Sequence, residues 1–270
     1  MTTLTGKKII AFNYFGGKYQ YLEELYAHFP EHFHFVELMC GSSGVILNKT
    51  PSKMDTGNDL DGDVINFFSV LRNKPEELKL SLQLTPVHRQ EYLNCFPINK
   101  EDIDDVERAR RFFVRCKLSF QGSGLKKHTG FNACVATSEQ SRSKNVTKFL
   151  SSIDRLDEVI DRLRTIQFEN VDYRTCLKKY DRPETFFYAD PPYELRKRNY
   201  KKWYNEEFVS DQDHIVLAAE LSAIQGKAMV SGYESELYNE LYKNWRFVKL
   251  KPRGHSMSKE PKQECIWMNY

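Results

Sequence analysis

The sequence predicts an α/β fold whose core is an open, mainly parallel β-sheet. The first observation is the run from Phe186 to Ala189, four apolar or aromatic residues that lead directly into Asp190. Such a short continuous run is typical of a strand buried on both faces. The second is the stretch from His34 to Met39, which a glycine-rich loop joins to a helical pattern. A length of 270 residues is enough for one large α/β domain with an inserted subdomain.

Composition narrows the class of protein further. Hydrophobic residues make up 40% of the chain and charged residues 29%, which is an ordinary globular balance. No apolar run approaches the length that spans a membrane, and Met1 to Lys8 lack the apolar core of a signal peptide. The six cysteines include no close pair of metal-ligand spacing. We therefore expect free thiols, no metal site and a cytoplasmic location.

The first candidate ligand contact is the turn Gly16-Gly17, followed by Lys18. Two glycines let the backbone turn tightly and approach a ligand closely. A helix is predicted from Tyr19 to Phe29, because apolar residues recur on one face. Lys18 lies near the start of this helix, where a cation is unfavourable to the helix dipole and a ligand carboxylate would explain it better. Considered alone, a turn with a solvated lysine is the simpler interpretation.

A strand, a glycine loop and a helix follow, in the order that α/β proteins use to receive a nucleotide or adenosyl group. The strand runs from His34 to Met39, the loop from Cys40 to Gly44, and the helix from Val45 to Lys49. Cys40 and Gly41 are therefore candidate cofactor contacts. A glycine loop by itself is a weakly specific signal.

Two acidic residues accompany this loop. Glu37 lies near the end of the strand, where it could bind a ribose or an ammonium group. Asp59 follows it by 22 residues, a spacing at which an acid commonly takes ribose hydroxyls. The chain has no Walker-type phosphate loop, which favours a nucleoside-bearing ligand. The alternative is that Asp59 or Asp61 caps the helix predicted from Val64 to Leu71.

The stretch from Asp190 to Tyr193 carries the predicted chemistry. Pro191 and Pro192 stop the strand, so Asp190 should stand at the carboxyl end of a central strand, where open sheets bind ligands. The Asp190 side chain and the Pro191 carbonyl could each accept an N–H of a planar exocyclic amine, while Tyr193 stacks on its ring. These acceptors favour a pyramidal nitrogen and stabilise its developing positive charge. The alternative is a strand that ends in a plain proline turn.

The pattern changes after Asn73. Helices are predicted from Pro75 to Leu82, from Val87 to Cys95 and from Asp104 to Ser119, and a basic, glycine- and serine-rich stretch follows. We find no parallel-strand signal in this part of the sequence, which indicates an inserted, mainly helical subdomain. The predicted division is residues 1–73, 74–149 and 150–270.

The α/β pattern then resumes. An amphipathic helix is predicted from Leu150 to Leu163, and the strand from Thr165 to Phe168 is expected next to the Asp190 strand. Asp172 and Tyr173 follow this strand and could hold an adenine ring by its amine and its face, although a strand-end turn explains them nearly as well. The remaining predictions are a helix from a Ser210 capping box to Gln225, a helix from Ser235 to Tyr242, and strands at Ala228–Val230, Phe247–Leu250 and Cys265–Met268.

The net charge is only +3, but the basic residues are unevenly distributed. Basic stretches in a nearly neutral chain indicate a polyanion-binding face, and one stretch directly follows the Asp190 loop. Solvated loops are the alternative for any single stretch. The candidate nucleic-acid contacts are Lys117, Gln121, Lys126, Lys127, Arg142, Lys144, Arg196, Lys197 and Arg198.

In combination, these motifs resemble the Dam-type, D12-class DNA N6-adenine methyltransferases. The matching stretches are Tyr14 to Lys18, Phe35 to Glu37 with the Cys40 to Gly44 loop, Asn58-Asp59, Asp172-Tyr173, Asp190 to Tyr193, Ser231 to Tyr233 and Glu264 to Asn269. Their order is specific, and they cover essentially the whole catalytic portion. The resemblance implies a Rossmann-like sheet that binds S-adenosyl-L-methionine as methyl donor.

The resemblance also implies roles for individual residues. Tyr14, Lys18, Asp59 and Asp190 would contact the cofactor, and the segment from residue 74 to 149 would recognise the target. The substrate would be double-stranded DNA with the target adenine rotated out of the duplex. A bacterial or phage-encoded enzyme and a restriction endonuclease counterpart are both compatible with the resemblance.

Two positions depart from the family pattern. Ser43 stands where the second glycine of the first loop is expected, and Gly44 can substitute for it. Family members that read GATC tend to carry an arginine after an Asn-Gly turn, whereas this chain has Gln121 to Leu125 there. We therefore do not assume a GATC target.

Other functions remain as alternatives at this stage. N4-cytosine methylation poses the same chemical problem and is the nearest. Methylation of a protein glutamine or an RNA amine fits the basic insertion less well. A catalytically silent DNA-binding relative would have no need of the intact stretch from Asp190 to Tyr193.

Overall fold

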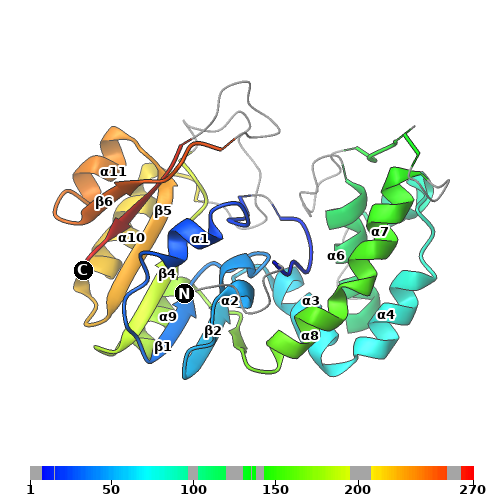
Figure 1. The fold of residues 1–270 in the computed structure, drawn as a ribbon, viewed down its shortest axis with the longest axis horizontal. Helices are drawn as coiled ribbons and strands as arrows, with labels where there is room; N and C mark the ends of the chain where they lie inside the picture. Colours follow the sequence, from blue (N-terminus) through cyan, green and yellow to red (C-terminus); the bar gives the residue numbers. More distant parts are fainter. Residues whose placement is uncertain are drawn as a thin grey trace.

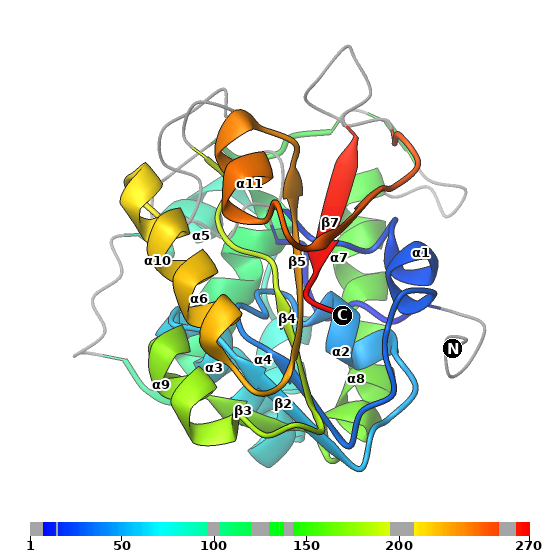
Figure 2. The ribbon, with the colours of Figure 1, turned by 90° about the vertical axis from the view of Figure 1, so that its left-hand side faces the viewer.

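The computed structural model describes residues 8–14, 16–96, 103–119, 130–134, 136–137, 143–194, 208–253 and 263–270. They contain a seven-stranded sheet of order β3-β2-β1-β4-β5-β7-β6 (Figures 1 and 2). Strands β1 to β5 pair in parallel, and β7 is antiparallel to both β5 and β6. This confirms the predicted α/β fold. The strands are β1 (His34–Glu37), β2 (Met54–Asn58), β3 (Gln167–Glu169), β4 (Thr185–Ala189), β5 (Lys227–Tyr233), β6 (Arg246–Lys249) and β7 (Glu264–Met268).

Helices cover both faces of the sheet, because successive residues of a buried strand point to opposite sides. On β4, Phe186 and Tyr188 belong to one apolar core cluster, and Phe187 and Ala189 belong to the other. The first face carries α1 (Leu22–Tyr26), α2 (Gly44–Asn48), α3 (Gly62–Asn73) and α8 (Leu156–Leu163). The second carries α9 (Tyr173–Tyr180), α10 (Asp211–Ala223) and α11 (Glu236–Leu241), which lie to the left of β4 and β5 in Figure 2.

Among the described residues, four further helices lie between β2 and β3 in the chain. They are α4 (Pro75–Gln83), α5 (Arg89–Asn94), α6 (Asp105–Leu118) and α7 (Lys144–Asp154). Helix α6 packs against α3, α4, α5 and α7, so that a helical body stands beside the sheet (Figure 1). The described part of this region is thus mainly helical, as predicted. Among the described residues, no helix is both long and apolar enough to cross a lipid bilayer.

Two predicted helices differ from the structure by three or more residues at one or both ends. The helix expected from Leu150 to Leu163 begins six residues earlier as α7 and is interrupted at Arg155 before α8. The earlier start has a local cause, because the Ser143 hydroxyl caps α7 by accepting from the Asn145 N–H. The helix expected from Tyr19 is also shorter and begins at Leu22 after a turn.

The expected position of β3 was wrong. β3 pairs with β2 at the edge of the sheet, so β2 and β1 separate it from β4. Its residues are exposed or half-buried, as suits an edge strand, whereas every residue of β1 and β4 is buried. Sequence order alone does not determine the neighbour of a parallel strand, because each crossover can carry the chain over several strands.

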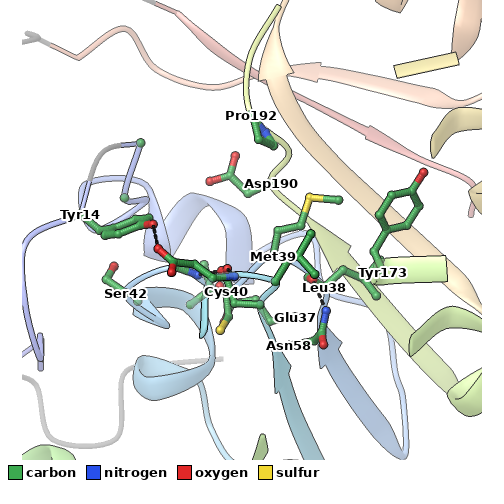
Figure 3. Close-up of a pocket in the computed structure, with 18 of the residues that line it drawn as sticks. Tyr14, Glu37, Leu38, Met39, Cys40, Ser42, Asn58, Tyr173, Asp190 and Pro192 are labelled. Carbon is green, nitrogen blue, oxygen red and sulfur yellow. Dashed lines mark hydrogen bonds between the residues drawn. The ribbon is translucent and has the colours of Figure 1, made fainter. Parts of the chain in front are cut away.

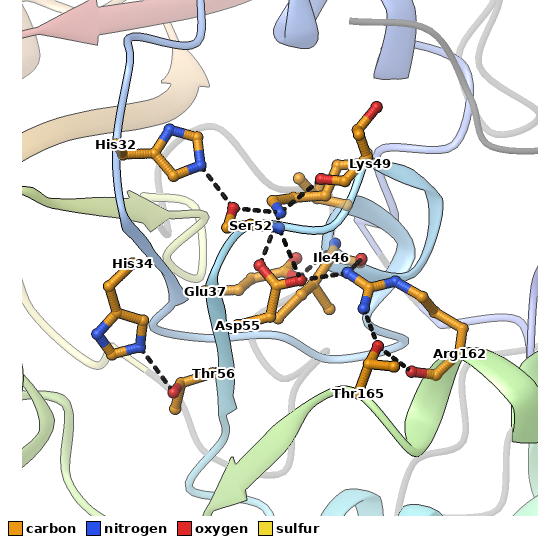
Figure 4. Close-up of polar contacts among 12 residues, drawn as sticks. His32, His34, Glu37, Ile46, Lys49, Ser52, Asp55, Thr56, Arg162 and Thr165 are labelled. Atoms are coloured by element: carbon orange, nitrogen blue, oxygen red, sulfur yellow. Dashed lines mark hydrogen bonds and ion pairs between the residues drawn. The ribbon is translucent and has the colours of Figure 1, made fainter.

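Buried ion pairs join two helices of the first face to the sheet. Asp55 on β2 accepts hydrogen bonds from Lys49, which follows α2, and from Arg162 on α8 (Figure 4). Arg162 also donates to the Ile46 carbonyl oxygen at 3.0 Å. These contacts connect α2, β2 and α8 in one cluster, which we call the Lys49 cluster (Lys49, Asp55 and Arg162).

Candidate active site

The carboxyl ends of β1, β2 and β4 open onto one pocket (Figure 3). β1 lies between β2 and β4, where the order of the parallel strands reverses, and such switch points are the usual ligand sites of open α/β sheets. All the predicted cofactor-binding residues except Asp172 line this pocket. They are Tyr14, Gly16, Gly17, Lys18, Glu37, Cys40, Gly41, Asp59, Tyr173 and Asp190.

The loop after β1 contains two residues with positive φ, Gly41 and Ser43. Gly41 has φ +47°, and a Cβ there would lie 3.0 Å from the Tyr14 ring. Ser43 has φ 54° and is the single non-glycine residue with positive φ among those described. The second glycine of the family pattern is expected at this position, so the departure at Ser43 carries a conformational cost.

The two acids after β2 have different roles. Asp61 caps α3 by accepting from the Asp63 N–H, and it also accepts from the Tyr14 hydroxyl at 3.2 Å. Asp59 lines the pocket, and its carboxylate accepts from the N–H groups of Gly41 at 2.7 Å and Asp61 at 2.8 Å. The predicted capping role therefore belongs to Asp61, while Asp59 fixes the glycine loop beside the pocket.

Glu37 and Asn58 hold the strand ends together. Glu37 is buried, and its Oε2 accepts from the Ile46 N–H in α2 at 2.9 Å. Burial raises the pKa of Glu37 well above its usual value. Asn58 donates to the carbonyl oxygens of Leu38 at 2.9 Å and Val171 at 3.0 Å, which ties the loop after β3 to the end of β1.

Asp172 and Tyr173 separate in the structure. Asp172 caps α9 by accepting from the Arg174 N–H, and it pairs with the Arg174 side chain at 2.8 Å. The described residues that line the pocket include Tyr173 but not Asp172. Asp172 is thus the N-cap of α9, a helix that the sequence did not predict, and its carboxylate serves the first turn of that helix.

Asp190 stands at the end of β4, as predicted, and its side chain is 18% exposed. Lys18 Nζ lies 2.6 Å from both of its carboxylate oxygens, and the Ser231 hydroxyl donates to Oδ1 at 2.9 Å. Burial raises the pKa of Asp190, although Lys18 and Ser231 oppose this shift. The carboxylate is thus a fixed acceptor at the pocket wall.

Lys18 is buried, so the interpretation as a solvated lysine is wrong. Its ammonium donates to the Gly16 carbonyl at 3.0 Å, to Asp190, and to the Tyr193 hydroxyl oxygen at 2.7 Å. All three N–H groups therefore have acceptors within the protein. Burial disfavours the charge of Lys18, but Asp190 and Glu264 together raise its pKa. The carboxylate that explains this lysine is the protein's own Asp190.

Tyr193 differs from the stacking residue that the sequence suggested. Its ring is 7% exposed and lies against Tyr233, with ring centroids 4.5 Å apart. Its hydroxyl donates to the two carboxylate oxygens of Glu264 at 2.9 and 3.1 Å. Of the proline pair, Pro192 lines the pocket and Pro191 is buried. The ring of Tyr193 is thus held away from the pocket by its own hydrogen bonds.

Sequence reasoning assigned no individual role to several residues of the site. Glu264, at the start of β7, contacts Lys18, the lysine that pairs with Asp190. The sequence signal that could have identified Glu264 was an acid at the start of an otherwise apolar strand. The apolar wall of the pocket was also missed, because its residues follow strand ends without any motif. It includes Leu38, Met39, Leu60, Val171 and Phe208.

Most of the predicted nucleic-acid contacts lie outside the described residues. These are Gln121, Lys126, Lys127, Arg142, Arg196, Lys197 and Arg198. Lys144 is exposed in the first turn of α7. Lys117 is half-buried with its Nζ 5.4 Å from the centre of the Phe113 ring, and burial lowers the pKa of Lys117 to about 8.

Comparison with known proteins agrees with this geometry. The model of the D12 class N6 adenine-specific DNA methyltransferases matches residues 14–257. The chain belongs to this family. A DNA N-6-adenine-methyltransferase of Escherichia phage P1 is 30% identical over 122 residues, which cover 41% of this chain and 15% of the phage protein. A DNA adenine methylase of Vibrio cholerae serotype O1 is 29% identical over 122 residues, which cover 43% and 44% of the two chains.

These matches confirm the resemblance drawn from the motifs. The chain spans less than half the length of the relatives it matches. The family model, in contrast, extends from the Tyr14 turn to beyond Arg253 and thus contains both the pocket and Asp190.

Proposed function

We propose that this protein transfers a methyl group from S-adenosyl-L-methionine to the N6 amine of adenine in double-stranded DNA. The observation that supports this most directly is the position of Asp190. Its carboxylate stands in the wall of the pocket that the glycine loop and Asp59 also line. An acceptor for an amine and a site for an adenosyl ligand therefore share one cavity.

The residues of the pocket fit this cofactor. Gly41 has no Cβ that would press on the Tyr14 ring. The loop therefore leaves room for a ligand to approach its backbone closely. Asp59 offers a carboxylate for ribose hydroxyls, and Tyr14 and Tyr173 lie on opposite sides of the pocket (Figure 3). S-adenosyl-L-methionine supplies a methyl group on a positively charged sulfur, so that a nitrogen–carbon bond forms as the sulfur–carbon bond breaks and its electron pair returns to sulfur.

The chain's own contribution is to prepare the amine. The Asp190 carboxylate and the Pro191 carbonyl accept its two N–H groups, which turns the nitrogen lone pair out of conjugation with the ring. Both acceptors stabilise the positive charge that develops on nitrogen. The surplus proton leaves the methylated nitrogen after transfer, which restores a neutral amine. No covalent enzyme intermediate is required.

The target amine lies inside the duplex, so the base must be extruded to reach Asp190 at a cost of a few kcal/mol. The helical region between β2 and β3 stands beside the sheet (Figure 1), and this position supports a role in target recognition. Contacts of Arg196, Lys197 and Arg198 with phosphates would help to offset the cost of extrusion. A domain division at residues 73 and 149 would place the second boundary inside α7.

Two alternatives are less favoured. The matched family and both relatives are named for adenine, which argues against N4-cytosine methylation. A catalytically silent relative would not need to keep Asp190 in contact with Lys18 and Ser231 at a pocket wall. A restriction endonuclease counterpart would take no part in methyl transfer, so it has no bearing on the roles of the site residues.

The deciding experiment measures transfer of a tritiated methyl group from the cofactor to duplex DNA, followed by digestion to nucleosides. We expect label in N6-methyladenine. Label in N4-methylcytosine would replace the proposed target, and an enzyme that binds DNA without transfer would support the silent relative. Sequencing of modified bases after expression in a methylation-free host then identifies the recognition sequence.

Binding measurements test the DNA contacts separately. Affinity should fall steeply with salt, and Lys197→Ala should lower that slope by about one unit if Lys197 contacts a phosphate. Lys243→Ala is a matched control, because this lysine is exposed just after the end of α11 and pairs with Glu240. Fluorescence of 2-aminopurine at the target position should rise on binding. A probe that stays quenched while the duplex is methylated would contradict extrusion.

A further inference from the structure

Glu264 is a buried acid in the active site without a role in the reaction described so far. It is the first residue of β7 and is 3% exposed. β7 pairs with β5 in a register that sets Glu264 opposite Tyr233. The Glu264 carboxylate accepts the Tyr193 hydroxyl through both oxygens and lies 3.5 Å from Lys18 Nζ. A buried carboxylate is costly, which calls for a reason beyond packing.

The contacts form a continuous chain from Glu264 to Asp190, the proposed acceptor of the reacting amine. The Tyr193 hydroxyl donates a hydrogen bond to Glu264 and accepts one from Lys18. Lys18 in turn donates hydrogen bonds to both oxygens of Asp190. Lys18 thereby orients the Asp190 carboxylate. We call Glu264, Tyr193, Lys18 and Asp190 the Lys18 cluster.

The sum of charges in this cluster decides how well Asp190 can act. A lysine ammonium 2.6 Å away neutralises the carboxylate and opposes positive charge on a nearby amine. With Glu264 ionised, two carboxylates and one ammonium sum to −1. With Glu264 protonated, the cluster is neutral. The excess negative charge favours the positive charge that builds on the amine nitrogen during transfer.

We propose that Glu264 is a positioning residue of methyl transfer, which anchors Lys18 and Tyr193 and supplies the excess negative charge that keeps Asp190 a strong hydrogen-bond acceptor. This inference rests on the proposed function. Glu264 is not expected to touch the cofactor or the base, because Tyr193 and Lys18 stand between it and the pocket.

The groups around Glu264 determine its titration. Burial raises the pKa of Glu264 to about 7; Lys18 opposes this shift and Asp190 adds to it. The rate of transfer should therefore rise with pH through about 7, as Glu264 ionises. Other titratable or charged groups on the surrounding elements are Tyr21, Tyr188, Tyr233, Glu234, Tyr238, Lys249 and Arg253.

The test is the pH profile of the single-turnover rate in Glu264→Gln. The amide keeps the shape of the side chain but cannot ionise. We expect its rate to stay near the low-pH level of the wild type and to be about tenfold lower at pH 8, equivalent to about 1.4 kcal/mol in the barrier. The cofactor dissociation constant should change less than about twofold, since Glu264 does not line the pocket. Glu240→Gln on α11 is the matched control, because Glu240 is 72% exposed and pairs with Lys243.

Two further variants separate charge from packing. Glu264→Asp keeps the charge and should restore the rise with pH. Tyr193→Phe removes the hydroxyl that links Glu264 to Lys18, and it should lower the rate while the pH dependence of Glu264 persists. If Glu264→Gln does not fold, Tyr193→Phe decides, and a wild-type rate in that variant overturns the inference.

The outcomes distinguish this inference from the proposed function. A wild type that transfers methyl groups, together with a Glu264→Gln variant of unchanged rate and pH profile, overturns the role of Glu264 alone. A folded wild type that transfers no methyl group from the cofactor to duplex DNA at any pH overturns the function and the inference with it.

Discussion

Two lysine–aspartate pairs among the described residues have the same closest N···O distance but opposite surroundings. In each pair the lysine Nζ lies 2.6 Å from the nearest carboxylate oxygen. Lys18 and Asp190 meet at the carboxyl end of β4, where the Asp190 side chain is 18% exposed. Lys49 and Asp55 meet near the amino end of β2, where their side chains are 0% and 1% exposed (Figure 4).

The third charged residue is an acid in one cluster and a base in the other. Glu264 adds an acid to the Lys18 cluster, and Arg162 adds a base to the Lys49 cluster. Burial disfavours the charge of Asp55, but Lys49 and Arg162 together lower its pKa, whereas burial raises the pKa of Asp190. Burial also lowers the pKa of Lys49 to about 8; Asp55 opposes this shift and the charge of Arg162 adds to it.

We infer that this difference separates a reactive arrangement from a structural one. In our proposal, the excess of acid beside the pocket makes Asp190 a strong acceptor for a ligand amine. An excess of base in a closed interior keeps Asp55 ionised and ties α2, β2 and α8 together. A lysine–aspartate pair therefore does not by itself indicate a reactive or a structural role. The charge of the third residue that contacts the pair distinguishes the two.

The largest expected effect is on catalysis. Asp190→Ala should lower the single-turnover rate by at least roughly 10²–10³-fold, because the amine loses its principal acceptor. Asp190→Asn should also be severely impaired, since an amide oxygen is a weaker acceptor. The variants should still fold, because Lys18 keeps Tyr193 and Glu264 as partners. Near-normal rates in either variant, with folding checked by thermal unfolding, would show that Asp190 has been assigned the wrong role.

The corresponding change in the Lys49 cluster should affect stability. Asp55→Ala leaves the Lys49 ammonium and the Arg162 guanidinium buried without the carboxylate that they share. The expected cost is about 3–5 kcal/mol in the free energy of unfolding. Denaturant unfolding measures this loss. Asp157→Ala is the matched control, because its pair with Lys79 is 63% exposed at the aspartate and should cost less than about 1 kcal/mol.

The pH dependence of stability follows from the same cluster. The pKa of Asp55 is lower in the folded chain than in the unfolded chain. Its stabilising contribution is therefore fully present above the unfolded pKa of about 3.9 and is lost as the pH falls through the folded pKa. Asp55→Asn should remove this part of the acid sensitivity. An unchanged acid transition in a folded Asp55→Asn variant would place the sensitivity elsewhere.

Asp59 is a third carboxylate at the strand ends, held by backbone N–H groups of Gly41 and Asp61. Asp59→Ala should weaken cofactor binding by about 1.5–3 kcal/mol, the range for hydrogen bonds to a charged group. Titration calorimetry with S-adenosyl-L-methionine measures the change. Asp161→Ala on α8, where the side chain is 82% exposed, should bind as the wild type does. Equal affinities for all three proteins would move the ribose site away from Asp59.

The smallest expected effect concerns α2, which leads from the pocket loop to the Lys49 cluster. Ser43 precedes this helix with φ 54°, a conformation that costs an L-residue about 1–2 kcal/mol and a glycine very little. Ser43→Gly should therefore raise the free energy of unfolding by about 1 kcal/mol. Ser43→Ala, which keeps the strain, should bring no gain. A loss of stability in Ser43→Gly would mean that the hydroxyl matters more than the backbone.

Much of the fold was predictable because its signals are local. The buried strand before Asp190, the strand–loop–helix unit around Gly41 and the capping box at Ser210 each depend on residues close together in the chain. A strand that ends in a polar residue also determines which edge of a parallel sheet that residue occupies. The sequence by itself therefore determined the α/β class and the edge of the sheet at which Glu37, Asp59 and Asp190 meet.

The tertiary structure decided how those residues are employed. It placed Lys18 on Asp190, 172 positions away in the chain, and it joined Tyr193 to Glu264, 71 positions away. It also put β3 at the edge of the sheet and left Asp172 as a helix cap. These outcomes depend on strand order and on the sum of charges brought together in a buried space. Neither quantity is carried by a local pattern, because burial and opposing charge arise only when distant segments meet.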